Sequence, residues 1–420
     1  MTSTQQHRAR VVGYAGATGL ALAVVFLLAV ILIPSAHAQT YTVLHAFEGG
    51  DGANPQAGLI EDEAGNFYGT TSSGGEACYY GYYCGTVFKL DHNGVFTTLH
   101  VFTGPPADGV FPRSGLVLDA AGNLYGTTYQ GGLYDVHGAT GGTVFKLDPA
   151  GNETVLYNFT GEADGRWPGS LIQDAHGNLF GVTRNGGDPA CDGWYGGCGT
   201  VFELDAAGNF TTLHTFTGNP DGGYPGGVLV LDAEGNLYGT TMNGGTYEAG
   251  TLFKLDPTGA VTILHNFTNR RDGGAPMGSL IRDAAGNFYG TTQQGGYRSR
   301  GTLYKLLADG SIVGLHVFQG SWSDEDGADP DAGVIRDQAG NLYGTTYRDG
   351  IFGEGMVFKV NVDTHEETVL HSFTGKGDGG HSYGELIHSG GSLYGTTNEG
   401  GDRTCNPPTG CGVVFKIKLR

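Results

Sequence analysis

The chain has 420 residues, 78 of them glycine, and a formal net charge of −20 at neutral pH. Glycine this abundant, interleaved with apolar runs and without the every-third-residue spacing of collagen, indicates many tight turns and an all-β fold. The charge opposes nucleic acid and anionic membranes as partners, because both bind to positively charged protein surfaces.

The N-terminal segment has the three parts of a secretory signal. Basic residues, among them Arg8 and Arg10, are followed by an apolar run over residues 11–33 and by the sequence Ala36-His37-Ala38. This pattern predicts a signal peptide over residues 1–38, cleaved after Ala38, and a mature chain secreted to the periplasm or the extracellular space. An uncleaved anchor is the alternative, since the apolar run nearly reaches the ~20 residues that span a bilayer. No second long apolar run follows, so we expect no stable membrane span in the mature chain.

From about residue 41 the chain consists of one repeated unit. The motif D-x-x-G-N-(L/F)-Y-G-T-T has seven near-copies, with the aromatic at Tyr68, Tyr125, Phe180, Tyr238, Tyr289, Tyr343 and Tyr394. A second motif, G-T-V-F-K-L-D, follows each copy. A third motif, L-H-x-F-T-G, begins at Leu44, Leu99, Leu156, Leu213, Leu264, Leu315 and Leu370. The third motif is displaced, because its first copy precedes the first G-N-x-Y-G-T-T.

Each unit contains four short strand-like runs. In the second unit they cover residues 115–118, 124–128, 143–147 and 154–159, and they are rich in β-branched, aromatic and leucine residues. D-x-x-G turns join the first run to the second and the third to the fourth, which predicts two hairpins and a four-stranded antiparallel sheet. The third run is apolar on both faces, with Val144 on one and Phe145 on the other, so neighbouring sheets must cover both.

Four-stranded sheets repeated in this way predict a seven-bladed β-propeller. The displaced third motif predicts the closure: the segment from Tyr41 to Phe47 supplies the outermost strand of the last blade and pairs with residues 413–417. We therefore expect one domain over residues 39–420, and a monomer.

The six cysteines form three close pairs at equivalent places in different repeats. In an exported protein this pattern predicts disulfides between Cys78 and Cys84, between Cys191 and Cys198, and between Cys405 and Cys411. Zinc fits these spacings poorly.

The motifs G-N-L-Y-G-T-T, G-T-V-F-K-L-D and F-T-G-x-x-D-G-x-x-P together resemble the tandem repeat of the choice-of-anchor GloVer-containing proteins. The resemblance covers about residues 41–420 and implies an exported repeat domain of uncharacterised function, with no assigned activity.

An Asp-Gly pair precedes each first strand, and a histidine recurs in the fourth strand. The aspartates are Asp51, Asp108, Asp164, Asp221, Asp272, Asp326 and Asp378. The histidines are His45, His100, His214, His265, His316 and His371, with Tyr157 in the remaining blade. Asp-Gly favours interblade turns over a ring of cation sites. Histidines on separate blades cannot converge on one ion, so we expect each to be hydrogen-bonded within its blade.

The loops between second and third strands differ from blade to blade, and we expect ligand binding there. Their candidate ligand-binding residues are Tyr79, Tyr80, Tyr82, Tyr83, Tyr134, His137, Trp194, Tyr195, Tyr247, Tyr297 and Phe352. Tyr and Trp beside carboxylates suit sugars or peptides. The alternative is that these aromatics only pack their own loops.

The sixth interblade loop is unusually acidic. Its carboxylates Asp324, Asp326, Asp329 and Asp331 could gather oxygen ligands for calcium, although the loop does not match the EF-hand pattern and a solvated acidic loop is the alternative. No cofactor is required by any motif.

The sequence lacks an H-E-x-x-H or Walker motif, and no catalytic residue can be assigned. We therefore predict an exported recognition module for a carbohydrate or protein ligand. The alternatives are a polysaccharide-active hydrolase or lyase that uses loop carboxylates, and a purely structural surface protein.

Overall fold

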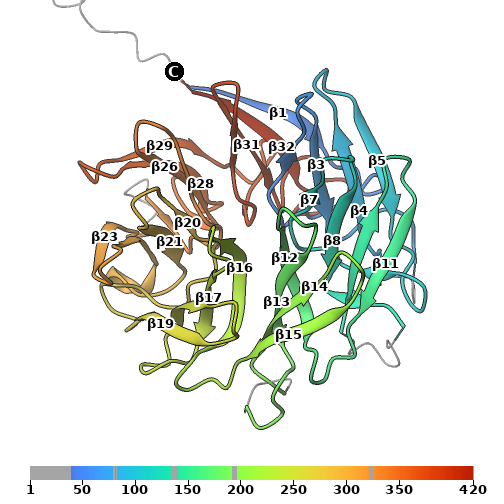
Figure 1. The fold of residues 1–420 in the computed structure, drawn as a ribbon. Coiled ribbons are helices and arrows are strands. Elements are labelled where there is room, and N and C mark those ends of the chain that lie inside the picture. The colour runs from blue at the N-terminus through green and yellow to red at the C-terminus, as the bar shows by residue number, and fades with distance from the viewer. Residues whose placement is uncertain are drawn as a thin grey trace, which may run out of the picture. The chain divides into compact units, whose positions relative to one another are not determined.

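Seven four-stranded antiparallel sheets are arranged radially in the computed structural model (Figure 1). The structure describes residues 39–78, 81, 83–133, 141–191, 196–320 and 326–419. Residues 40–420 form one compact unit. The predicted signal peptide over residues 1–38 lies outside the described residues, and in the described part no helix is long and apolar enough to cross a membrane.

The strands of each blade follow one another from the central channel outward. Blade one contains β2 (Ile60–Glu61), β3 (Phe67–Thr71), β4 (Thr86–Leu90) and β5 (Phe96–Val101), and blade two contains β7 (Val117–Leu118), β8 (Leu124–Thr128), β10 (Thr143–Leu147) and β11 (Glu153–Asn158). Blade three contains β12 (Arg166–Gln173), β13 (Leu179–Asn185), β14 (Thr200–Leu204) and β15 (Phe210–Thr215), and blade four contains β16 (Gly223–Leu231), β17 (Leu237–Asn243), β18 (Thr251–Leu255) and β19 (Val261–Asn266).

The remaining blades repeat this order. Blade five contains β20 (Ile281–Arg282), β21 (Phe288–Thr292), β22 (Thr302–Leu306) and β23 (Ile312–Val317), and blade six contains β25 (Ile335–Arg336), β26 (Asn341–Thr346), β28 (Met356–Asn361) and β29 (Glu367–Ser372). Blade seven contains β30 (Ile387–Ser389), β31 (Ser392–Thr397), β32 (Val413–Lys418) and β1 (Thr40–Ala46). Two short ladders pair β6 (Gly109–Val110) with β9 (Gln130–Gly131) and β24 (Gly327–Ala328) with β27 (Arg348–Asp349), and a 3₁₀ turn, η2, covers Tyr297–Ser299.

The repeated motif builds the inner hairpin. In blade two the Asp119 carboxylate accepts hydrogen bonds from the backbone N–H groups of Ala121 and Asn123, and Gly122 takes a φ of +83° to close the turn. The Tyr125 hydroxyl donates to the same carboxylate at 3.1 Å. The glycine of G-T-T admits the next strand's aromatic ring, because a Cβ at Gly126 would lie 2.6 Å from the Phe145 ring. The repeated residues of the motif therefore form the turn and the internal packing of the blade.

Aromatic pairs join the blades. The phenylalanine of each L-H-x-F-T-G packs edge to face on the aromatic residue of the next blade's third strand, as with Phe216 on Phe253 at a centroid distance of 5.2 Å. The equivalent pairs are Phe47 with Phe88, Phe102 with Phe145, Phe159 with Phe202, Phe267 with Tyr304, Phe318 with Phe358, and Phe373 with Phe415. All are buried. Both faces of each sheet are covered by neighbours, as predicted.

The N-terminal strand closes the ring, which confirms the prediction drawn from the displaced motif. Strand β1 runs antiparallel to β32 from Thr40, opposite Lys418, to Ala46, opposite Val413 (Figure 1). The Tyr41 hydroxyl donates to the Asp378 carbonyl at 2.6 Å, which ties β1 to the preceding interblade loop. The seventh blade therefore contains both ends of the described chain.

Three disulfides pin the loops between second and third strands in blades one, three and seven. They join Cys78 to Cys84, Cys191 to Cys198, and Cys405 to Cys411. Within the part of the chain that the structure describes, no cysteine is free. The local pairing is the one that the sequence predicts.

Candidate functional site

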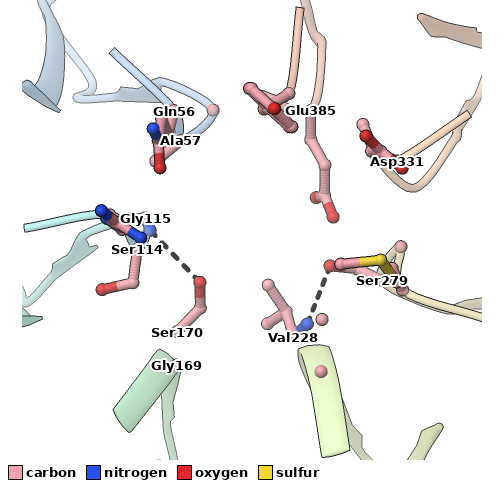
Figure 2. Close-up of a pocket in the computed structure, with 18 of the residues that line it drawn as sticks. Gln56, Ala57, Ser114, Gly115, Gly169, Ser170, Val228, Ser279, Asp331 and Glu385 are labelled. Carbon is pink, nitrogen blue, oxygen red and sulfur yellow. Dashed lines mark hydrogen bonds between the residues drawn. The ribbon is translucent and has the colours of Figure 1, made fainter. Parts of the chain in front are cut away.

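A cavity of about 1070 Å³ occupies the centre of the propeller. Its wall consists of the segments that lead into the innermost strands, together with residues that directly follow the G-T-T motifs. At its inner part, neighbouring blades are linked around the ring: the Ser170 hydroxyl accepts from the Gly115 N–H, and the Ser279 hydroxyl accepts from the Val228 N–H (Figure 2). The backbone segments of the cavity wall thus repeat from blade to blade, while the side chains that they carry differ.

The residue before each interblade proline, or before its replacement Ser382, has a left-handed backbone conformation. Its φ is between 50° and 59° at Asn54, Phe111, Trp167, Tyr224, Ala275, Asp329 and His381. In every case the N–H donates to a carbonyl of the preceding blade, such as Trp167 to Gly141 at 2.9 Å. This conformation is costly for residues other than glycine, and it persists where the surroundings hold it.

Blades two and three contribute an aromatic and cationic wall to the cavity. The Tyr129 and Trp167 rings stack at a centroid distance of 4.9 Å with an interplanar angle of 17°. The Arg113 guanidinium lies 4.5 Å from the centroid of the Tyr129 ring. Arg184 lines the same wall. Within the described ranges neither Arg113 nor Arg184 forms an ion pair with a carboxylate.

Blades five and six contribute a more acidic wall. Asp331 accepts a hydrogen bond from the Gln293 amide at 2.9 Å, and Asp329 lies 3.7 Å from Arg348. Burial raises the pKa of Asp331 to about 7, with repulsion from Asp329 adding to it and the Gln293 bond opposing it. Asp331 therefore ionises near neutral pH.

Two tyrosines extend this wall toward blade seven. Tyr347 and Tyr383 pack at a centroid distance of 4.5 Å, and burial followed by the interaction with Tyr347 raises the pKa of Tyr383. Beside them His381 lies 3.0 Å from Glu354 and 3.9 Å from Glu399. Two carboxylates from loops of different blades thus meet at one histidine, next to the cavity.

Glu385 is the acidic side chain at the inner part of the cavity, where its carboxylate points into the space (Figure 2). Burial raises its pKa, and hydrogen bonds from Ser279 and Gly333 oppose that rise. The equivalent positions in the six other blades are Gly58, Gly115, Ser170, Val228, Ser279 and Gly333. Glu385 therefore gives the cavity an acidic group that the repeat does not require.

The loop aromatics predicted to bind ligand lie elsewhere. Tyr83, Tyr247, Tyr297 and Phe352 are between 53% and 61% exposed, and none of them lines the cavity. The other predicted residues, Tyr79, Tyr80, Tyr82, Tyr134, His137, Trp194 and Tyr195, lie outside the described residues. Binding by these loops stays a prediction.

The carboxylates predicted to bind calcium point to different partners. Asp326 accepts hydrogen bonds from the backbone N–H groups of Gln319 and Gly327, while Asp329 and Asp331 line the cavity. Asp324 lies outside the described residues, and the calcium prediction stays untested.

The recurring histidines bond to the recurring aspartates, which confirms a local structural use. The Nε2 to carboxylate distances are 2.7 Å for His45 with Asp51, 2.9 Å for His214 with Asp221, 3.1 Å for His265 with Asp272, and 3.0 Å for His371 with Asp378. Tyr157 takes the same role, since its hydroxyl donates to Asp164 at 3.0 Å.

Sequence reasoning missed Arg113, Tyr129, Trp167 and Arg184 because they sit inside the repeated motifs. A signal was present: the position just before proline differs in all seven copies, and the positions just after proline and just after G-T-T vary from copy to copy, while their neighbours repeat. Variable positions within a constant framework mark the cavity wall.

The fold and this wall define the class of protein, a seven-bladed β-propeller with a polar, aromatic-lined central cavity. The model of the Gloeobacter/Verrucomicrobia repeat matches residues 33–231 and 224–420. The chain belongs to this repeat family, as the resemblance of its motifs indicated.

Solved structures share the fold at low identity. The oligogalacturonate lyase of Vibrio parahaemolyticus is 10% identical with a TM-score of 0.55, over 92% of this chain and 95% of the lyase. The extracellular domain of a hybrid two-component system from B. thetaiotaomicron is 12% identical with a TM-score of 0.54, over 90% of this chain and 41% of that one. A puromycin-hydrolysing peptidase of Mycobacterium tuberculosis is 13% identical with a TM-score of 0.54, over 85% of this chain and 52% of the peptidase. No curated protein sequence matches this chain.

Proposed function

We propose that this protein is an exported carbohydrate-binding propeller whose ligand, an acidic sugar chain, enters the central cavity. One observation carries the proposal: Arg113 lies over the Tyr129 ring, which in turn stacks on Trp167, at the wall of a cavity of about 1070 Å³. A stacked aromatic pair offers a flat apolar face to a sugar ring. A guanidinium beside it offers bidentate hydrogen bonds to a carboxylate.

The net charge of the protein also bears on the choice of an acidic ligand. A chain with a net charge of −20 repels anions over most of its surface, so an acidic ligand needs a local cationic site. Arg113 and Arg184 both line the cavity, and within the described ranges neither is neutralised by an ion pair. The acidic wall at Asp329 and Asp331 would accept hydrogen bonds from sugar hydroxyls on the other side.

Export is the second part of the proposal, with the signal peptide cleaved after Ala38. Three disulfides support it, because disulfides persist in oxidising compartments. The match to extracellular domains of two-component systems is in keeping with it. The N-terminal residue of the protein recovered from the culture medium or the periplasm would test it, and a chain that still began at Met1 would contradict cleavage.

Binding can be tested on a glycan array followed by calorimetry with galacturonic-acid oligomers and matched neutral oligomers. We expect preference for the acidic series. W167A and R113Q should each weaken binding by about tenfold or more, which corresponds to at least ~1.4 kcal/mol. Y297A is the matched control, because Tyr297 is an exposed loop aromatic that does not line the cavity. Loss of binding in Y297A with normal binding in W167A would move the site to the loops.

Catalysis on such a ligand is the second candidate, and the observation that favours it is Asp331, whose pKa of about 7 suits a proton donor or acceptor at neutral pH. A reducing-end release assay with acidic polysaccharide separates the two functions. Release that D331N abolishes supports an enzyme, and binding without release supports a recognition module. Absence of both leaves a structural surface protein.

A further inference from the structure

At five blade boundaries the fourth-strand histidine or tyrosine also contacts the next blade. The residue it faces lies at or next to the start of that blade's fourth strand and is here called the facing position. It pairs in register with the last apolar residue of the third strand. Phe96 stacks on His45 at 3.7 Å, Phe210 on Tyr157 at 4.0 Å, and Tyr41 on His371 at 3.9 Å between ring centroids. The facing positions are Tyr41, Phe96, Glu153, Phe210, Val261, Ile312 and Glu367.

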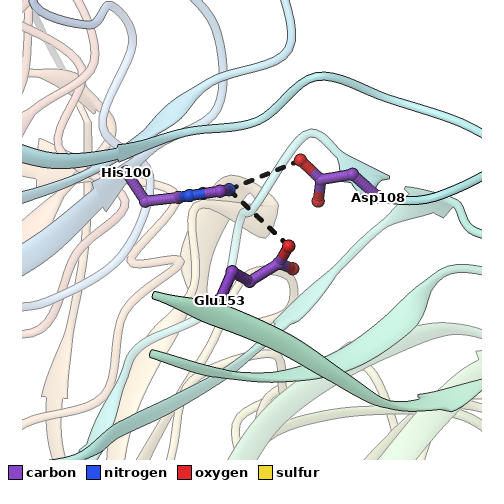
Figure 3. A group of neighbouring side chains, drawn as sticks. All are labelled: His100, Asp108 and Glu153. Carbon is purple, nitrogen blue, oxygen red and sulfur yellow. Dashed lines mark hydrogen bonds and ion pairs between the residues drawn. The ribbon is translucent and has the colours of Figure 1, made fainter. Parts of the chain in front are cut away.

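Five facing positions are apolar and two are glutamate, and both glutamates add a carboxylate to a histidine–aspartate pair. The Nε2 of His100 lies 3.4 Å from Asp108 and 3.9 Å from Glu153 (Figure 3). At the boundary of blades five and six, the Nε2 of His316 lies 3.4 Å from Asp326 and 3.6 Å from Glu367. In each cluster the three ligand atoms lie within 4.8 Å of one another.

The geometry of both clusters differs from that of the simple pairs. Where the facing residue is apolar, the histidine–aspartate distance is 2.7 to 3.1 Å, a direct hydrogen bond. Where it is glutamate, the distance opens to 3.4 Å in both clusters. The imidazole then stands between two carboxylates rather than against one.

A buried oxygen in each cluster lacks a partner. Oε1 of Glu153 and Oε1 of Glu367 are buried and, among the described residues, have no hydrogen-bond partner. Each cluster thus places a second carboxylate, with one oxygen that the described residues leave unsatisfied, beside a histidine–aspartate pair.

We propose that His100, Asp108 and Glu153, and likewise His316, Asp326 and Glu367, each bind one divalent transition-metal ion, which links two neighbouring blades. The aspartate and histidine come from one side of the blade boundary and the glutamate from the other. Each ion therefore bridges two sheets, in addition to the apolar packing and the backbone hydrogen bonds that already join them.

The donor set indicates the kind of ion. One imidazole nitrogen with two carboxylate oxygens suits Zn²⁺ and its neighbours better than Ca²⁺, which prefers six or more oxygens. Donors at about 2.0–2.2 Å from a tetrahedral Zn²⁺ stand roughly 3.3–3.6 Å apart, near the observed 3.4 to 3.9 Å. The aspartates are oriented by backbone amides, since Gly109 donates to Asp108 and Gly327 to Asp326.

Metal content of the tag-free mature protein, loaded with Zn²⁺ alone and dialysed, provides the test. We expect two equivalents per chain in the wild type, one in E153F, one in E367F, and none in the double variant. Phenylalanine is the natural residue at two other facing positions, so these variants reproduce an existing blade boundary. E153Q and E367Q provide a second, isosteric pair should either phenylalanine variant fail to fold, as judged by circular dichroism.

The control is E63Q, which changes an exposed acidic residue and should keep two equivalents. Zn²⁺ should also raise the midpoint of thermal unfolding in the wild type and in E63Q, but not in the double variant. A wild type without bound Zn²⁺ would overturn the proposal. So would a double variant that kept both equivalents, because the ions would then lie elsewhere.

Discussion

Replacing Phe47 with alanine tests whether the N-terminal strand closes the ring in solution. Phe47 is completely buried, packs edge to face on Phe88 at 5.3 Å and lies 5.7 Å from Phe96 between ring centroids. Truncating a buried phenylalanine costs about 3–5 kcal/mol. For a unit of about 380 residues, the unfolding entropy of ~2.1 cal/mol/K per residue converts 4 kcal/mol into a fall in Tm of about 5 °C.

The matched control for F47A is F216A. Phe216 is also completely buried and packs on Phe253 at 5.2 Å, but at a boundary between two blades that are continuous in sequence. Because the closing boundary has the same construction, both variants should lose similar stability in urea denaturation and calorimetry. A full loss in F216A with less than about 1 kcal/mol lost in F47A would refute docking of β1 in the seventh blade.

Three further predictions concern single interactions. Y125F removes the hydroxyl that donates to Asp119 and should lower the free energy of unfolding by about 1 kcal/mol in urea denaturation; no change would mean that the motif tyrosine acts only through packing. The double variant C191S/C198S opens a short disulfide loop and should cost about 2 kcal/mol, while reducing agent should then destabilise it less than the wild type. Since burial raises the folded-state pKa of Asp331 to about 7, its contribution to stability is present below the unfolded pKa near 4 and is lost as pH rises through 7. D331N should therefore flatten the fall in stability between pH 4 and 7, and an unchanged slope would contradict the buried carboxyl.

The fold could be predicted because every blade repeats the same local chemistry. D-x-x-G turns determine the hairpins, and the predicted strand over residues 143–147 coincides with β10. The first predicted strand, over residues 115–118, is shorter in the structure because only Val117–Leu118 pairs with β8. The preceding residues instead line the cavity, where Ser114 bonds to Thr127.

The cavity wall could not be predicted from the sequence in the same way. Arg113, Tyr129 and Trp167 meet because a proline loop and the residue after G-T-T of adjacent blades converge on the channel, and this convergence depends on ring closure. The segments that differ most between repeats are the long loops between second and third strands, which contain the exposed Tyr247 and Tyr297. The informative residues were single variable positions inside the repeated motifs.

The left-handed residue before each proline explains how such positions can vary. Ala275 and Asp329 have nearly the same φ, 50° and 53°, although their side chains differ in size and charge. In both, the N–H donates across the blade boundary, to Ala249 at 2.9 Å and to Arg300 at 3.0 Å, and the carbonyl accepts from the residue after G-T-T at 3.1 and 3.0 Å. The backbone conformation is therefore held by hydrogen bonds that no side chain makes. Side chains at this position can change without altering the blade, so the cavity wall can acquire a tryptophan in one blade and an aspartate in another while the sevenfold framework stays the same.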